Sequence, residues 1–309
     1  MRLLTPCAHF SFFTFSFSLY MYSYPIQKTI IGDDIDLAYV QLGEGDQTLV
    51  FIHGFASHIP VWEHNLNILR KYYRCLALDL PGHGLSAKGD FSYSLDFYGQ
   101  IVKQWLDKLG IQKAVLVGHS MGGQISIRLA LQYPDLFSRL VLVAPAGFET
   151  FTATEKTLLA QFASGNILAS SQYLKWVLNL KNYFYNLNEK ELAKLNELNR
   201  DFFSVTENQY LPQILAGSIQ GMMNAPVFDQ LSNLALPTLI FFGKNDQLIP
   251  NKLLHATQTT ERIAQQGTSQ IPQSKLILYN QCGHFLQYEQ PSRFNIDVYK
   301  FLNPHIFGH

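Results

Sequence analysis

The sequence is poor in cysteine. Its 309 residues include three, Cys7, Cys75 and Cys282, and an odd, scattered set of this size is neither a disulfide framework nor a metal site. Cys75 stands in an apolar run that predicts a strand, where cysteine acts as a small buried hydrophobe. A reducing compartment is therefore the default expectation.

Charge of either sign is also scarce. Charged residues make up 15% of the chain, 23 basic residues balance 23 acidic ones, and hydrophobic residues make up 47%, which excludes a disordered chain. No Lys/Arg cluster could neutralise several phosphates, so no nucleic-acid partner is expected. The neutral balance gives no sign of an obligatory protein partner. We expect a small-molecule substrate.

The N-terminal stretch lacks the features of a clear targeting or membrane segment. Residues 1–24 are rich in Phe and Ser, but polar residues interrupt the apolar run and no A-x-A-like cleavage site follows. Two interpretations stay open: a mis-assigned start, with Met21 in place of Met1 as the first residue, or a weak signal or anchor. The first predicts a cytoplasmic protein. The second predicts an exported or membrane-associated one, and membrane contact is expected only in that case.

Short apolar runs that alternate with helix-period segments dominate the rest of the chain. The runs are rich in Val, Ile, Leu and Phe and mostly continuous, as in strands covered on both faces. Alternation of this kind predicts βαβ units and a mainly parallel sheet. The predicted strands lie in 35–43, 48–54, 74–82, 113–120, 139–145, 237–246 and 275–284, and the clearest helices in 61–73, 94–110 and 120–135.

The alternation stops between Gly147 and Leu236, where helical patterns alone occur, at 155–163, 170–180 and 188–203. A helical block between two strands of one sheet is typical of a cap. We therefore predict an uncertain N-terminal extension at 1–24, an α/β core formed by 25–146 and 237–309, and a helical cap at 147–236.

The segment GHSMG, residues 118–122, matches the pattern G-x-S-x-G. It follows a predicted strand and opens a predicted helix, which is the context of a nucleophile elbow. A serine in so sharp a turn leaves no room for side chains two residues away, and this explains Gly118 and Gly122. An ordinary turn would explain one glycine but not the whole box.

A nucleophilic serine needs a base, and the base needs a group that orients it. Asp246 follows PTLIFFGKN and His284 follows KLILYNQCG, so each stands at the end of a predicted strand segment. Each could singly be a turn or surface residue. Their joint placement at strand ends, in the order Ser, Asp, His, predicts a catalytic triad of Ser120, Asp246 and His284.

These segments resemble the α/β-hydrolase superfamily, in the form of a serine hydrolase with a helical cap. The resemblance covers about residues 25–303 and rests on HGF (53–55), DLPGHGLS (79–86), GHSMGG (118–123), GKND (243–246) and GHFLQYEQP (283–291). It implies an eight-stranded, mostly parallel sheet with the cap between strands six and seven. By the same resemblance the backbone N–H groups of Met121 and Phe55 would form the oxyanion hole.

Several other polar residues have simpler interpretations. His53, His83 and His119 are expected as turn and packing residues near the site, Asp79 as the residue that ties down the PGHG turn, and Glu289 as a support for the last helix or the histidine loop. No pair has metal-ligand spacing, so neither a metal nor another cofactor is expected.

Apolar side chains in the predicted cap suggest an apolar acyl pocket. We expect an uncharged, apolar, small or medium ester as substrate, although many of these side chains would be ordinary helix core. The candidate pocket residues are His119, Phe162, Trp176, Tyr183, Phe184, Met222, Met223 and Phe285.

Two alternatives to a serine carboxylic ester hydrolase stay open. Serine at 120 argues against the dehalogenases and epoxide hydrolases that use aspartate there. The meta-cleavage product hydrolases, which cleave C–C bonds, share a similar S-M-G-G, but a Trp usually follows their histidine, where this chain has Phe285, and Arg200 is the single arginine of the cap available for an acidic substrate. A hydrolase-fold binding protein without turnover is the alternative from another class.

Overall fold

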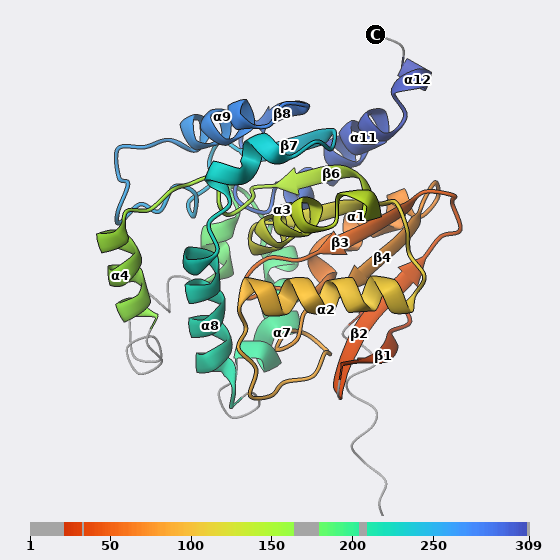
Figure 1. Ribbon diagram of the computed structural model, residues 1–309, viewed down its shortest axis with the longest axis horizontal. Helices are drawn as coiled ribbons and strands as arrows, with labels where there is room; N and C mark the ends of the chain where they lie inside the picture. Colours follow the sequence, from red (N-terminus) through yellow and green to blue (C-terminus); the bar gives the residue numbers. More distant parts are fainter. Residues whose placement is uncertain (1–21, 33, 164–178, 204–208, 308–309) are drawn as a thin grey trace, which may run out of the picture.

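Eight strands form one sheet in the part of the chain that the structure describes (Figure 1). The computed structural model describes residues 22–32, 34–163, 179–203 and 209–307. The sheet order is β1-β2-β4-β3-β5-β6-β7-β8. β2 is antiparallel to both of its neighbours and the other pairs are parallel, which confirms the predicted fold class. The strands are β1 Gln27–Ile31, β2 Ile35–Leu42, β3 Thr48–Ile52, β4 Arg74–Leu78, β5 Ala114–His119, β6 Phe137–Val143, β7 Thr238–Gly243 and β8 Ser274–Tyr279.

The sheet is covered on both faces, as its continuous apolar strands predict. All residues of β5 and β7 are buried. Leu116 of β5 belongs to one hydrophobic core, and its neighbours Val115 and Val117 belong to a second core on the opposite face, because successive side chains of a strand point to opposite faces. Strand β5, which leads into Ser120, therefore lies between two cores.

The helices of the α/β core divide between these two faces. On one face lie α2 Leu95–Lys108, α3 Met121–Gln132 and α9 Thr260–Gln270. The other face is covered by α1 Glu63–Leu69 and α11 Pro291–Leu302. Two shorter helices, α10 Leu286–Glu289 and α12 Pro304–Phe307, and the 3₁₀ turns η2 Ile59–Trp62 and η3 Pro134–Leu136 complete this part. The ends of α2 follow local signals, since Ser94 caps its start by accepting from the Phe97 N–H and Gly110 follows its end at φ 64°.

Strand β1 was not among the predicted strands. Its sequence QKTII has no continuous apolar run, and only its last residue is buried. It pairs with β2 alone at the edge of the sheet, where one face can stay in water. The sequence pattern of a buried strand therefore does not apply to it.

Helices and 3₁₀ turns occupy the described part of the region between β6 and β7, as predicted for the cap. They are α4 Ala153–Phe162, η4 Leu180–Tyr183, α7 Glu189–Phe203, α8 Leu211–Asn224 and η5 Phe228–Asn233. Figure 1 shows α4, α7 and α8 on the same side of the sheet. Most of the helix predicted at 170–180 lies outside the described residues. The division of the chain at 147 and 236 stays a prediction.

Helix α8 was not among the predicted helices because two glycines interrupt its pattern. The structure gives these glycines a packing role. A Cβ at Gly217 would lie 2.7 Å from the Ser92 carbonyl oxygen, and one at Gly221 would lie 3.0 Å from the Leu95 nitrogen. The absence of side chains at these two positions lets α8 lie directly against the start of α2.

The first described residues pack onto the α/β core. Tyr22 and Tyr24 are buried, and the Tyr24 hydroxyl donates to the Glu63 carbonyl oxygen at 3.0 Å. Residues 22–24, predicted as the end of an extension, thus contact the helix that follows the turn after β3. None of the helices in the described ranges is long and apolar enough to cross a membrane.

Candidate active site

Ser120 occupies the sharp turn between β5 and α3. Its backbone has φ 53° and ψ −117°, a conformation that costs a non-glycine residue of the order of 1–3 kcal/mol. The surrounding backbone holds it there: the Ser120 N–H donates to the Val143 carbonyl oxygen, and the Ser120 carbonyl oxygen accepts from Gly123 and Gln124. The serine is thus presented beyond the end of the strand.

The glycines around Ser120 are required sterically. A Cβ at Gly118 would lie 2.5 Å from the Gly122 carbonyl oxygen, and a Cβ at Gly122 would lie 2.3 Å from the Ile52 carbonyl oxygen of β3. Gly123 faces Pro145, and a Cβ added to this glycine would lie 2.8 Å from the proline Cβ. The glycine box is therefore explained by close backbone approach, as the sequence predicted.

His284 and Asp246 form a buried pair. Nδ1 of His284 lies 2.7 Å from Oδ2 of Asp246, and both residues are 2% exposed. The other carboxylate oxygen accepts from the N–H groups of Leu248 and Ile249. Because a carboxylate oxygen accepts, this contact pairs it with an Nδ1–H of the imidazole, and Nε2 is the ring nitrogen that does not face Asp246.

The loop that carries His284 is held from two directions. The His284 N–H donates to the Tyr183 carbonyl oxygen at 2.7 Å. One carboxylate oxygen of Glu289 accepts from the Gly283 N–H and the other from the N–H groups of Tyr185 and Asn186. The expectation that Glu289 supports the histidine loop is confirmed. Its carboxylate also joins that loop to the segment between β6 and β7.

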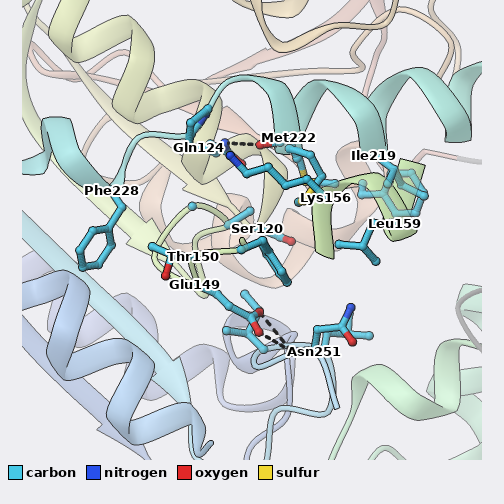
Figure 2. Close-up of a pocket in the computed structure, with 18 of the residues that line it drawn as sticks. Ser120, Gln124, Glu149, Thr150, Lys156, Leu159, Ile219, Met222, Phe228 and Asn251 are labelled. Atoms are coloured by element: carbon cyan, nitrogen blue, oxygen red, sulfur yellow. Dashed lines mark hydrogen bonds between the residues drawn. The ribbon is translucent and has the colours of Figure 1, made fainter. Parts of the chain in front are cut away.

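Ser120 and His284 line one cavity of about 300 Å³. Figure 2 shows Ser120 in the middle of this cavity, with Lys156 above it and Glu149 and Asn251 below it. Phe55 also lines the cavity. A Cβ at Gly54 would lie 3.0 Å from the Ser120 Cβ, so the turn before Phe55 lies directly against the serine. Met121 begins α3 beside Ser120.

Six of the eight predicted pocket residues line the cavity, namely His119, Phe162, Tyr183, Met222, Met223 and Phe285. Phe184 does not, and instead stacks on Phe285 with 5.2 Å between ring centroids. Trp176 lies outside the described residues. The region between β6 and β7 thus contributes apolar side chains to the cavity that contains Ser120.

The polar side chains of the cavity wall were missed by sequence reasoning. They include Gln124, Glu149, Thr150, Lys156 and Asn251. Gln124 was within reach of prediction, since it lies four residues after Ser120 on α3 and so on the same helix face. The others come from separate loops and from α4, and nothing local in the sequence marks them.

Glu149 is the most buried carboxylate among these polar wall residues. It accepts from the Asn251 N–H and from Nδ1 of His255, with 2.5 Å between Nδ1 and Oε1. Burial raises the pKa of its carboxyl, partly offset by the hydrogen bond from His255. His255 also lies 3.3 Å from Glu155 of α4, so this cluster joins the first cap helix to the core.

His53, His83 and His119 are all buried, as expected of turn and packing residues. Burial lowers the pKa of His119 well below its usual value, and burial lowers the pKa of His53 to about 4. His53 Nε2 accepts from the Leu80 N–H at 2.9 Å, and its Nδ1 donates to the Gly54 carbonyl oxygen. Asp79 accepts from the Leu85 and Ile59 N–H groups, which confirms it as a turn residue.

Comparison with known proteins agrees with this fold. The alpha/beta hydrolase fold family matches residues 47–291. The chain is 30% identical over 287 residues to an uncharacterized hydrolase of Bacillus subtilis, YugF, covering 90% of this chain and 98% of that protein. It is 27% identical over 275 residues to a 2-hydroxy-6-oxononadienedioate/2-hydroxy-6-oxononatrienedioate hydrolase of a Pseudomonas species, covering 84% of this chain and 89% of that protein.

A solved structure shows the same fold. A probable hydrolytic enzyme from Pseudomonas aeruginosa superposes with a TM-score of 0.75 at 23% identity, over 91% of this chain and 95% of that one. The chain belongs to the alpha/beta hydrolase fold family and is an enzyme of the hydrolase class.

Proposed function

We propose that this protein is a serine hydrolase that cleaves carboxylic esters through an acyl-enzyme. The proposal rests on the buried His284–Asp246 pair and on the strained backbone of Ser120, which lines the same cavity as His284. A serine held in an unfavourable backbone conformation beside an oriented imidazole has a catalytic use. A protein that only binds ligand has no need of it.

The reaction follows from these positions. Ser120 Oγ attacks the ester carbonyl carbon while His284 Nε2 takes its proton, and the carbonyl oxygen becomes an oxyanion. The N–H groups of Met121 and Phe55 bind that oxyanion. His284 then protonates the leaving alcohol as the C–O bond breaks, which leaves the acyl group on Ser120. Water then attacks the acyl carbon while His284 takes its proton, and His284 returns a proton to Ser120 Oγ as the acid is released. Asp246 stays ionised and holds the imidazole in place.

The cavity supports a small or medium apolar acyl group. Phe162, Met222 and Met223 come from the region proposed as the cap at 147–236, and Phe285 from the core. A cavity of about 300 Å³ is at the lower end of the usual range for small-molecule sites. We propose a small-molecule substrate, with neither a metal nor an organic cofactor in the reaction.

Hydrolysis of a series of p-nitrophenyl esters, from acetate to palmitate, tests the proposal. Wild type is compared with Ser120→Ala, with the thermal stability of both measured. We expect the release rate to vanish in the variant and to peak at a short or medium chain in the wild type. A well-folded wild type without activity on any ester would contradict the ester hydrolase proposal.

Cleavage of a C–C bond is the second candidate. Lys156 of α4 lines the cavity, and no carboxylate of the described residues lies within 4.0 Å of its ammonium group. A cation there could bind a substrate carboxylate, a role for which the sequence offered Arg200 as the single arginine of the predicted cap. The Arg200 side chain lies outside what the structure describes. Turnover of a 2-hydroxy-6-oxo dienoate that falls in Lys156→Met, with ester hydrolysis absent, would favour this candidate.

A further inference from the structure

The side chain of Tyr22 reaches a buried turn behind the cavity. Its hydroxyl donates to Oδ2 of Asp79 at 2.5 Å, and the two residues are 7% and 0% exposed. A hydroxyl that donates to a buried carboxylate makes a charge-assisted hydrogen bond, stronger than one between neutral groups. Tyr22 precedes β1 and is remote in sequence from every proposed catalytic residue.

Asp79 connects Tyr22 to the turn after β3. Its Oδ1 accepts from the Ile59 N–H at 2.9 Å, and its Oδ2 accepts from the Leu85 N–H at 2.8 Å. A Cβ at Gly84 would lie 2.1 Å from Oδ2 of Asp79 and 2.4 Å from the Tyr22 hydroxyl. Gly84 therefore packs directly against both the Asp79 carboxylate and the Tyr22 hydroxyl. Ile59 is thereby fixed at the end of the segment 53–58.

The segment 53–58 needs such support because its backbone is strained. Ala56 has φ 52°, which costs a residue with a Cβ about 1–2 kcal/mol. The segment is held at its start by the Leu80 N–H, which donates to His53, and at its end by Asp79. Phe55, which lines the cavity, lies between these two anchors.

We infer that Tyr22 is a positioning residue for the segment 53–58, which we call the oxyanion turn. By holding Asp79, Tyr22 sets the position of the Phe55 N–H in that turn. The inference rests on the proposed function, in which that N–H binds the oxyanion. A displaced donor weakens binding of the transition state more than binding of the ester itself. Loss of the Tyr22 hydroxyl should therefore lower kcat and leave KM nearly unchanged.

Tyr24 supplies a matched control on the same segment. Its hydroxyl donates to the Glu63 carbonyl oxygen in α1, and its side chain is 9% exposed. No hydrogen bond joins it to Asp79 or to residues 53–58 within the described chain. Tyr24→Phe thus removes one hydroxyl and one hydrogen bond, as Tyr22→Phe does, without loosening the turn.

The experiment compares kcat, KM and thermal stability of wild type, Tyr22→Phe and Tyr24→Phe on p-nitrophenyl butyrate. We expect Tyr22→Phe to lower kcat about tenfold, a part of the 10²–10³ that a whole oxyanion donor contributes, with KM within about twofold. Tyr24→Phe should keep the wild-type kcat even if both variants melt earlier. Equal kcat in all three proteins, or an equal loss in both variants, would overturn the inference.

Amide hydrogen exchange of residues 53–59 provides a readout that needs no turnover. Faster exchange at Ile59 in Tyr22→Phe, but not in Tyr24→Phe, is the expected result, and unchanged exchange would overturn the inference. If the wild type hydrolyses no ester while exchange responds as expected, the structural link holds and the proposed function is what fails.

Discussion

At the scale of single residues, the proposed mechanism depends on the acceptor that faces His284. Asp246 holds Nδ1 of the imidazole at 2.7 Å and is itself held by two backbone N–H groups. Either histidine nitrogen can carry the proton in a neutral imidazole. The carboxylate is thus what selects the tautomer whose free nitrogen can serve Ser120.

Asp246→Asn should therefore lower kcat about 10³–10⁴-fold, because an amide NH₂ can turn toward Nδ1 and favour the wrong tautomer. The shape of the side chain is nearly unchanged, so the fold should survive. Steady-state kinetics on the best ester measure the effect, and circular dichroism checks folding. Retention of a tenth or more of the wild-type kcat would speak against Asp246 as the third member.

The residues proposed as the triad could be singled out from the sequence because each stands at the end of a predicted strand. The polar wall residues could not, with the exception of Gln124. Glu149 and Asn251 lie 102 positions apart in the sequence, and the fold brings them together so that the Asn251 N–H donates to the Glu149 carboxylate. Lys156 stands in the helix predicted at 155–163, where a lysine ordinarily faces water. Only its location beside the cavity distinguishes it.

At the scale of elements, two glycines of neighbouring helices differ in the space that surrounds them. A Cβ added to Gly122 in α3 would lie 2.3 and 2.4 Å from the backbone oxygens of Ile52 and His53. A Cβ added to Gly99 in α2 would meet only a side-chain carbon of Leu129, at 4.0 Å. The first glycine is required by the approach of β3 to α3. The second is not required by its surroundings.

Gly122→Ala should consequently destabilise the fold by about 1–3 kcal/mol, since the backbone of β3 or α3 must shift. Gly99→Ala, the matched control, should be neutral or raise the free energy of unfolding by up to about 1 kcal/mol, as alanine is the better helix former. Urea denaturation of both variants measures this. Equal effects of the two substitutions would show that the contact at Gly122 is not the cause.

Element prediction worked where a single pattern governs a whole segment. Seven strands were predicted from apolar runs, and β1 was missed because an edge strand has only one neighbour and a mostly exposed sequence. Helix α8 was missed because Gly217 and Gly221 lower helix propensity, whereas the packing that they permit against α2 outweighs that cost.

At the scale of the whole molecule, burial of neutral histidines couples stability to pH. Burial lowers the pKa of His53 to about 4 and of His58 to about 3, from an unfolded value of about 6.5. The unfolded chain therefore binds more protons below about pH 6.5, and stability falls as the pH falls toward these folded values. Above about pH 6.5 this contribution to stability is complete.

When the pH is lowered from 7.5 to 5, His58 alone should lower the free energy of unfolding by about 2 kcal/mol, since one pKa unit corresponds to about 1.4 kcal/mol. His58→Gln should show a correspondingly smaller loss of unfolding free energy over this range, and His305→Gln, at an exposed position of α12, should keep the wild-type loss. Because Asp79, whose pKa burial raises to about 6, is present in all three proteins, its opposite effect cancels. Parallel pH profiles for wild type and His58→Gln would disprove the assignment.

The sequence alone determined the class of fold and singled out Ser120, Asp246 and His284 as the residues proposed for a triad. Apolar periodicity and the steric needs of a turn are properties of consecutive residues, so they can be recognised without a structure. Only the tertiary structure decided the wall of the cavity and the link from Tyr22 through Asp79 to the oxyanion turn. These contacts join segments that sheet order and helix packing bring together, and no local pattern records which distant residue will fill a given space.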